Sequence, residues 1–350
     1  MRNLYVTGGQ QRVGRPLSAS ATDWYEYQQG LILEVVPETG EVCRRVEYVS
    51  PPAACAADNP QILFKSGTVL DDRLYVCTQT ELLIYTLPEF RQAGYISLPC
   101  FNDLHHVRPT PAGTLLVANS GLDMVLELTP GGGVLNAWSV LGEEPWTRFS
   151  RAIDYRKGVS TKPHTAHPNH IFMLGEDVWA TRFQQQDAIC LTRPDRRIAI
   201  GIERVHDGVL HNDRLFFTTV NGQIVIANPA SLKVEEIVDL TTMHDADTLL
   251  GWCRGILLDG EYAWVGFSHI RPTKLRENLA WVMRGFRQVL PTHVACYDLV
   301  RRRCVAKIDL QAHGLNAVFS IFPRYEEESW VCPDARPAGA SPASTGTLSI

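Results

Sequence analysis

The sequence lacks the long apolar segments that membrane proteins and secreted precursors need. Hydrophobic residues make up 45% of its 350 residues, yet no apolar run approaches the roughly 18 residues that span a bilayer as a helix. Its first residues, MRNLYVTGGQQRVG, show no apolar segment followed by a small-residue cleavage site. We therefore expect a soluble protein without a membrane span or a secretory signal.

Two further classes are disfavoured by the cysteines and by the charge. The nine cysteines are an odd number at irregular positions, which fits a reducing compartment better than a disulfide framework. A formal net charge of -5 is not the basic excess of a general nucleic-acid binder. These features predict a cytoplasmic protein without a nucleic-acid partner.

Three common motifs of catalysis and nucleotide binding are also absent. The chain contains no G-x-S-x-G elbow, no phosphate-binding P-loop and no G-x-G-x-x-G. Interpretations as a serine hydrolase, a nucleotide-binding protein or a dinucleotide-binding protein therefore lack support.

What the sequence does contain is an internal repeat. Residues 71–88 align with 212–229 without a gap, a third copy covers 112–130, and weaker copies span 176–191 and 260–269. Each copy has an anchor residue in its first apolar strand, and the anchors are Leu74, Leu115, Val178, Leu215 and Ala263. Successive anchors are 41, 63, 37 and 48 residues apart, so the base period is about 40 residues with insertions.

A repeat of about 40 residues with four strands is typical of a β-propeller blade. Five such units fall between residues 61 and 310, while three strands near the start and one at 316–323 supply a sixth. Pairing of the two ends of the chain would close the ring and remove a free sheet edge. We predict an all-β fold, a single propeller of six four-stranded blades, with five or seven as alternatives. The propeller would span residues 1–330, and 333–350, poor in large apolar residues, would be a disordered tail.

This architecture resembles the six-bladed propellers of the gluconolactonase, strictosidine synthase and NHL-repeat type. The segment FNDLHHVRPTPAGTLLVANSG (101–121) looks like the blade opening N-D…P-x-G-x-L-x-V of gluconolactonase relatives. The resemblance implies substrate-binding roles for Asn102 and Asp103. Because the family's full set of acidic and amide metal ligands is missing, its lactonase activity is not implied.

Long insertions are expected on one face of the propeller. The loop between the second and third strands of a blade and the crossing to the next blade open on the same side, where the inner strand also begins. Five insertions occupy such places: 10–30, 50–60, 141–169, 241–251 and 271–291. This side, called the decorated face below, is expected to carry the functional site. Trp24, within the first insertion, is a candidate wall of a substrate pocket.

The insertion at 271–291 predicts a basic amphipathic helix. Apolar residues recur at steps of three and four, and they are Leu275, Leu279, Val282, Phe286 and Val289. Basic residues occupy other positions. Such a helix packs on a blade edge, covers the channel mouth as a lid, or presents a surface to a membrane or a partner.

A column of polar residues is expected where the inner strands begin. Nine positions before the anchors stand Lys65, His106, Asn169, His206 and Arg254, and the sixth position falls near His313 or Asn316. A shift of one residue would replace Asn169 with His170. Buried ions cost several kcal/mol each without a compensating partner, so the column predicts a metal or an anion in the channel.

Two kinds of partner fit the column. His106, His170 and His206 come from successive blades and can hold a divalent metal (Zn, Fe, Mn, Ni, Cu or Ca) with an open position for water or substrate. In having histidines at successive blade openings the chain resembles peptidylglycine amidating lyase. Alternatively, Lys65 and Arg254 can hold a carboxylate, sulfate or phosphate.

Two smaller features accompany this column. Asp207 or Asp103 could orient a ligand imidazole through its second nitrogen. The loop KPHTAHPNH (162–170) places His164 and His167 at three-residue steps ahead of His170. Because two prolines interrupt the loop, we do not expect a compact three-histidine site within it.

The resulting hypothesis is a small-molecule enzyme with its active site at the channel mouth. A metal held by histidines would promote hydrolysis, elimination or isomerisation of a substrate with an anionic group. The candidate catalytic residues are Arg254, Lys65 and Asp207, and the candidate substrate-binding residues are Asn102, Asp103, Asn169, Trp24 and Asn316. A metal-free enzyme and a non-catalytic propeller that binds a protein partner through the decorated face are the alternatives. The substrate and the oligomeric state stay open.

Overall fold

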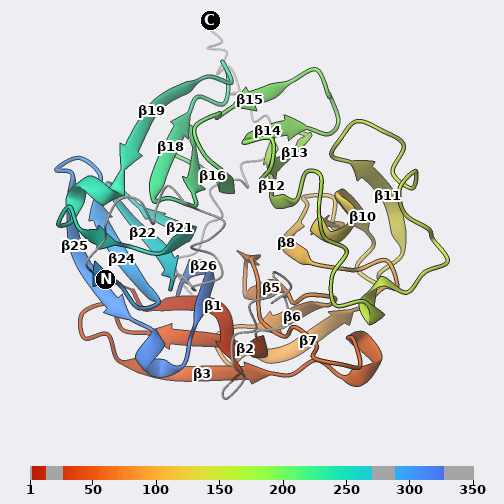
Figure 1. Ribbon diagram of the computed structural model, residues 1–350, viewed down its shortest axis with the longest axis horizontal. Coiled ribbons are helices and arrows are strands. Elements are labelled where there is room, and N and C mark those ends of the chain that lie inside the picture. The colour runs from red at the N-terminus through yellow and green to blue at the C-terminus, as the bar shows by residue number, and fades with distance from the viewer. Residues whose placement is uncertain (1, 13–26, 270–287, 327–350) are drawn as a thin grey trace, which may run out of the picture.

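The repeated units fold into six four-stranded antiparallel sheets, which stand as blades around a common axis (Figure 1). The region around this axis is called the channel below. The computed structural model describes residues 2–12, 27–269 and 288–326. In every blade the first strand lies at the channel and the fourth at the rim. The predicted all-β propeller with six blades is confirmed.

The first three blades are formed from both ends of the chain and its first third. From the channel outward, the first blade contains β26 (Ala317–Pro323), β1 (Leu4–Gln11), β2 (Tyr27–Val35) and β3 (Val42–Tyr48). The second contains β4 (Gly67–Leu70), β5 (Arg73–Cys77), β6 (Leu82–Thr86) and β7 (Arg91–Ile96). The third contains β8 (Leu104–Pro109), β9 (Leu115–Asn119), β10 (Met124–Leu128) and β11 (Val134–Ser139).

The other three blades follow in chain order. The fourth contains β12 (Pro168–Leu174), β13 (Asp177–Arg182), β14 (Asp187–Cys190) and β15 (Arg197–Ala199). The fifth contains β16 (Val205–His211), β17 (Arg214–Thr219), β18 (Gln223–Ala227) and β19 (Val234–Asp239). The sixth contains β21 (Trp252–Asp259), β22 (Tyr262–Ser268), β24 (His293–Asp298) and β25 (Arg303–Asp309). Short 3-10 turns join some strands: η1 (Pro52–Ala54), η2 (Ser120–Leu122), η3 (Tyr155–Lys157), η4 (Leu240–Met243) and η5 (Gln311–His313).

The sequence anchors lie in the second strands, as the repeat predicts. Leu74 and Leu215 are fully buried, and the neighbouring strand supplies apolar partners on the same face. Phe172 and Trp179 of the fourth blade, for example, pack in one cluster with Leu215 of the fifth. The core is thus a series of apolar layers between adjacent blades, which holds the inner strands rigidly at the channel.

The ring closes as predicted, because the last strand is the inner strand of the first blade. β26 pairs with β1 from Leu4 opposite Pro323 to Gly9 opposite Ala317. The two strands approach so closely at Gly8 that a Cβ there would lie 1.7 Å from the carbonyl oxygen of Ala317. Only glycine fits this position.

The five insertions occupy the predicted places between strands. Those at 50–60, 141–169 and 241–251 are crossings between blades, and those at 10–30 and 271–291 interrupt the first and sixth blades. The last one ends in β23 (Gln288–Val289), which pairs in parallel with β20 (Thr248–Leu249).

Several sequence predictions lie outside the described residues. They are Trp24, the body of the predicted helix within 271–291 and the tail at 333–350. Within the described ranges, no helix has the length and apolar character needed to cross a membrane.

Candidate metal centre at the channel mouth

β-Bulges mark the starts of the inner strands. The pairing register shifts in the third blade at His105, in the fourth at Asn169 and in the sixth at Arg254 and Gly255. The closing strand β26 has the same irregularity at Phe319. A bulge leaves one residue unpaired and turns its side chain away from the regular alternation. These residues therefore determine what faces the channel.

In the third blade the bulge separates two adjacent histidines. The His105 ring lies 4.5 Å from the His167 ring and 6.3 Å from Phe319 of the first blade, measured between centroids. His106 instead bridges blades, because its Nε2–H donates to the Gly67 carbonyl at 3.1 Å and its Nδ1 accepts from the Ile171 N–H at 3.1 Å. Both nitrogens of His106 are thus used by backbone groups.

The other two histidines of the predicted metal site also contact protein groups. The His170 ring stacks on His106 with centroids 3.7 Å apart. His206 Nε2 accepts a hydrogen bond from Trp252 Nε1 at 3.3 Å. In the described part of the chain these three histidines do not form a group whose nitrogens could share one ion.

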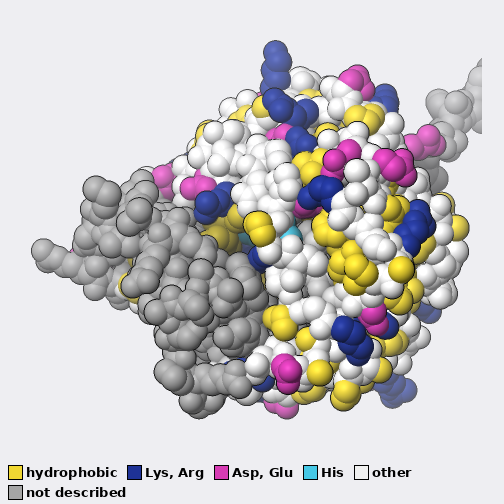
Figure 2. All heavy atoms as spheres, turned by 45° about the vertical axis from the view of Figure 1, so that its right-hand side comes forward, with side chains coloured by type: hydrophobic (Ala, Val, Ile, Leu, Met, Phe, Trp, Pro, Cys, Tyr) yellow, Lys and Arg dark blue, Asp and Glu magenta, His cyan; other side chains and the backbone are white. Residues whose placement is uncertain are grey.

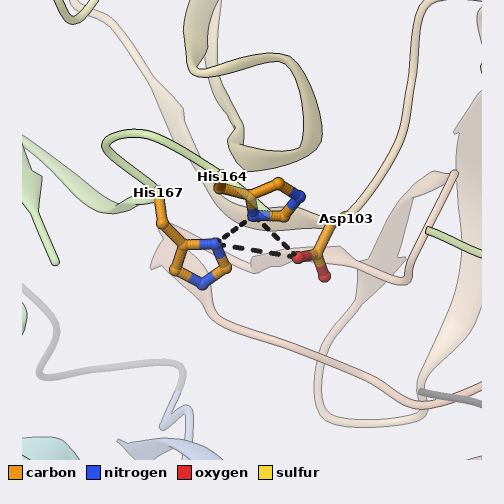
Figure 3. Close-up of side chains that lie close together, drawn as sticks. All are labelled: Asp103, His164 and His167. Atoms are coloured by element: carbon orange, nitrogen blue, oxygen red, sulfur yellow. Dashed lines mark hydrogen bonds and ion pairs between the residues drawn. The ribbon is translucent and has the colours of Figure 1, made fainter. Parts of the chain in front are cut away.

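A different trio converges instead: Asp103, His164 and His167 (Figure 3). His164 Nδ1 lies 2.6 Å from His167 Nδ1, and the two nitrogens lie 3.7 and 3.8 Å from Asp103 Oδ2. All three side chains are buried. Two nitrogens on one Zn²⁺ stand roughly 3.3 Å apart at bond lengths near 2.0 Å, so a ring movement of less than about 1 Å would admit an ion.

The second oxygen of Asp103 is held by a buried cation. Lys65 Nζ donates to Asp103 Oδ1, and the Lys65 side chain is 2% exposed. Burial lowers the pKa of Lys65, and Asp103 opposes this shift. Burial alone would raise the pKa of Asp103, but the positive charges around it, of which Lys65 contributes most, together outweigh burial and keep the pKa well below the usual range. Asp103 is therefore an ionised carboxylate at neutral pH, whereas its Oδ2 has no hydrogen-bond partner in the described residues.

A hydroxyl group determines the tautomer of His164. Thr161 Oγ1 donates its proton to the Gly121 carbonyl at 2.5 Å and lies 3.1 Å from His164 Nε2. Because that proton is already used, the hydroxyl accepts from His164 Nε2–H. Burial lowers the pKa of both His164 and His167, so His164 is neutral and its Nδ1 presents a lone pair to the trio. Such an outer hydrogen bond is typical of metal-bound imidazoles.

Both histidines of the trio belong to a long crossing, residues 140–167, which we call the strap. Asp123, at the turn between β9 and β10, accepts the N–H groups of Thr165, Ala166 and His167 at 2.9, 3.0 and 2.7 Å. Its Oδ2 also accepts from Arg148 Nη2 at 2.9 Å. One buried carboxylate therefore shapes the part of the strap that presents the two imidazoles.

The middle of the strap is fastened to the crossings that precede the second and third blades. Asn102 Nδ2 donates to the carbonyls of Tyr155 and Gly158 at 2.8 and 3.1 Å. Lys157 Nζ donates to carbonyls within 52–55, at distances of 2.8 to 3.3 Å. Asn102, expected from the sequence resemblance to bind substrate, is fully buried and holds the strap.

Asp207 ties the fifth and sixth blades together beside Arg254. Its Oδ2 accepts the Gly255 N–H at 2.9 Å and the Thr218 hydroxyl. Gly255 has a φ of 79°, which favours glycine. The carboxylate thus fixes the bulge from which Arg254 projects.

The two predicted asparagines differ in their surroundings. Asn169 Nδ2 donates to the Val205 carbonyl at 3.0 Å, while its buried Oδ1 has no partner in the described residues. Asn316 belongs to the ring closure, because its N–H donates to the Gly9 carbonyl at 2.8 Å and its Oδ1 accepts from the Gln11 N–H at 2.9 Å.

Metal-free protein is expected to lose stability as the pH falls below about 6.5. Burial lowers the pKa of nine histidines, which are His105, His106, His164, His167, His170, His206, His211, His244 and His293. The pKa falls to about 3 for His170 and about 4 for His293. In acid the unfolded chain binds protons at these positions before the native protein does, so each lowers the free energy of unfolding by up to about 1.4 kcal/mol per pH unit.

One group works in the opposite direction. Burial raises the pKa of Asp207 from 3.8 to about 6, so its stabilising contribution is present below 3.8 and is lost as the pH rises through about 6. Because nine histidines oppose one carboxyl group, the urea midpoint measured with a chelator should fall steadily from about pH 7.5 to pH 5. A constant or rising midpoint would contradict this expectation.

The sequence shows each part of this site separately, but no regular spacing connects the parts. The H-x-x-H of the strap and the Asp of FNDLHH are both visible, but Asp103 and His164 are 61 positions apart.

A small histidine surface is visible near the middle of Figure 2, recessed between side chains of other kinds.

Comparison with known proteins supports the fold alone. No family model and no curated protein sequence matches the chain. A protein of unknown function from Bacteroides caccae is similar in structure, with 14% identity and a TM-score of 0.59 over 93% of this chain and 100% of that chain. A chain of a nidogen/laminin complex has 10% identity and a TM-score of 0.53, covering 91% and 97%. Streptogramin B lyase has 13% identity and a TM-score of 0.44, covering 70% and 68%.

Proposed function

We propose that Asp103, His164 and His167 hold one divalent metal ion and that the protein is a metal-dependent enzyme acting on a small molecule with an anionic group. The observation that supports the site most directly is the buried Asp103 Oδ2, which lacks a hydrogen-bond partner among the described residues and faces two imidazole nitrogens (Figure 3). An unsatisfied buried polar atom costs about 1–3 kcal/mol, and an ion would remove that cost.

The donor set favours particular metals. Two imidazoles and one carboxylate suit Zn²⁺, Fe²⁺, Mn²⁺, Ni²⁺ or Cu²⁺, whereas Ca²⁺ prefers six to eight oxygen ligands. When bound, such an ion supplies Lewis-acid chemistry, which serves a hydrolysis, an elimination or an isomerisation. The set His106, His170 and His206 stays the alternative prediction.

The chain's own residues have separate tasks in this proposal. Lys65 orients Asp103, Thr161 holds His164 in the required tautomer, and Asp207 positions the bulge of Arg254. Arg254 supplies the positive charge for the substrate. A cytoplasmic location stays a prediction from cysteine usage.

Elemental analysis of protein purified without an affinity tag tests the proposal. We expect about one transition-metal ion per chain, removed by a chelator and restored by Zn²⁺ or Fe²⁺. Catalysis is then sought with a panel of lactones, esters and hydroxy acids that carry a carboxylate, and it should disappear with the metal. Absence of stoichiometric metal, or an activity that survives the chelator and an Asp103→Asn substitution, would refute a metal-dependent enzyme.

A further inference from the structure

Arg254 is a cation at the channel without a carboxylate partner among the described residues. Its Nε donates to the Val318 carbonyl at 2.8 Å, and its guanidinium carbon lies 3.5 Å from the centroid of the Phe319 ring. No acceptor in the described residues binds its two terminal amino groups. Burial lowers the pKa of Arg254 to about 10, so the group is still charged at neutral pH.

The other cation of the column is already paired. Lys65 is committed to Asp103. A ligand anion beside Phe319 therefore finds its positive charge at Arg254, while the guanidinium carbon of Arg204 lies 5.6 Å from the centroid of the Phe183 ring. With Nε occupied, the two terminal amino groups form an end-on pair of parallel donors.

An aromatic surface connects this cation with the proposed metal. Phe183 lies 5.4 Å from the ring of His167 and stacks with Trp252 at 6.1 Å, with 19° between the ring planes. Trp252 is two positions before Arg254 on β21. Phe183 and Trp252 are partly exposed, whereas the aromatic side chains packed between blades, such as Phe172 and Phe217, are buried. Phe183 therefore connects the proposed metal ligand His167 with Trp252, which shares β21 with Arg254.

We propose that the substrate of this site is a small carboxylate with a flat apolar body, bound with its carboxylate on Arg254 and its body along Phe183 and Trp252. The inference rests on the proposed function only for the reacting end of the molecule. A planar carboxylate needs two donors and fits the free pair of amino groups. A phosphate has three oxygens and up to two charges, which exceed the two terminal amino groups and the single charge of Arg254.

Four probes test the carboxylate site: benzoate, its neutral analogue benzamide, phenyl phosphate and acetate. Binding is measured by calorimetry and by tryptophan fluorescence on chelator-treated protein and again on Zn²⁺-loaded protein. Benzoate should bind at least 10-fold more tightly than each of the other three. The Arg254→Gln protein should no longer bind benzoate more tightly than benzamide. The Arg254→Lys protein keeps the positive charge but loses the pair of parallel donors, so it should bind benzoate about 10-fold more weakly.

The outcomes separate this inference from the proposed function. Equal binding of benzoate and benzamide, or unchanged benzoate binding by folded Arg254→Gln protein, overturns the carboxylate site even if metal is present. Tighter binding of phenyl phosphate identifies a phosphate site and also overturns it. Arg254-dependent benzoate binding by protein that takes up no metal upholds the inference while the metal centre fails. Phe183→Leu, which removes the aromatic ring but no charge, should weaken benzoate more than acetate.

Discussion

Protein with His164 or His167 replaced by alanine is expected to bind Zn²⁺ roughly 100-fold more weakly, or worse, than the unaltered chain. Changes in the outer hydrogen bonds of metal ligands already cost 10- to 100-fold in affinity, and these substitutions remove the ligand atom itself. The measurement is competition with a chelating dye near pH 7.5, where both imidazoles are neutral, together with metal content after dialysis.

A matched substitution separates the two candidate ligand sets. His206→Gln removes a histidine that lies equally deep in the channel, 5% exposed, but outside the trio. It should leave Zn²⁺ affinity within about threefold of the unaltered value if the trio holds the metal. Loss of metal from His206→Gln with retention in His164→Ala would reverse the assignment in favour of the set predicted from the repeat. Thermal melting without metal verifies that each variant is folded.

The Lys65→Met variant is expected to be about 3–5 kcal/mol less stable than the unaltered protein when metal-free. Removing one partner of a buried ion pair leaves the other charge uncompensated, and Asp103 is only 5% exposed. A divalent ion on Asp103 Oδ2 would supply the missing positive charge. Zn²⁺ should therefore raise the urea midpoint of Lys65→Met more than that of the unaltered protein.

A surface pair provides the control for this substitution. Arg302 contacts Glu236 on the rim, and their side chains are 44% and 34% exposed. Exposed pairs contribute about 0–1 kcal/mol, so Arg302→Met should change stability by less than about 1 kcal/mol. A loss of under 1 kcal/mol in Lys65→Met as well would mean that the pair with Asp103 is not effectively buried. An equal effect of Zn²⁺ on both proteins would argue against metal at Asp103.

The fold was predictable because its determinants recur along the chain. Leu74 and Leu215 occupy equivalent positions in two copies that align without a gap, and burial at the same place in every blade requires that pattern. The closing strand was predictable for a related reason: the inner strand missing from the first blade matched an apolar segment at 316–323. Alignment of the repeats thus determines which residues of each strand are buried, which the pattern of a single strand leaves open.

The candidate site was predictable only in part, because it depends on departures from the repeat. Counting from the anchor locates the start of the inner strand, but a bulge places His105 rather than His106 toward His167. The strap adds His164 and His167 through contacts with Asp103 that no local pattern encodes. The sequence predicts that Lys65 belongs to the polar column, but its pairing with Asp103 is visible only in the structure.

The ring closure has a consequence for when the chain becomes able to bind a ligand during its synthesis. The groups that hold Arg254 are the carbonyl of Val318 and the ring of Phe319, both on β26, which leaves the ribosome after all other strands of the propeller. A nascent chain that ends before β26 therefore contains Arg254 without the strand that orients it. Because the proposed ligand site needs β26, a ligand of Arg254 would stabilise the closed ring by RT ln(1 + [L]/Kd). Ligand binding by Arg254 would then indicate that β26 has paired and closed the propeller.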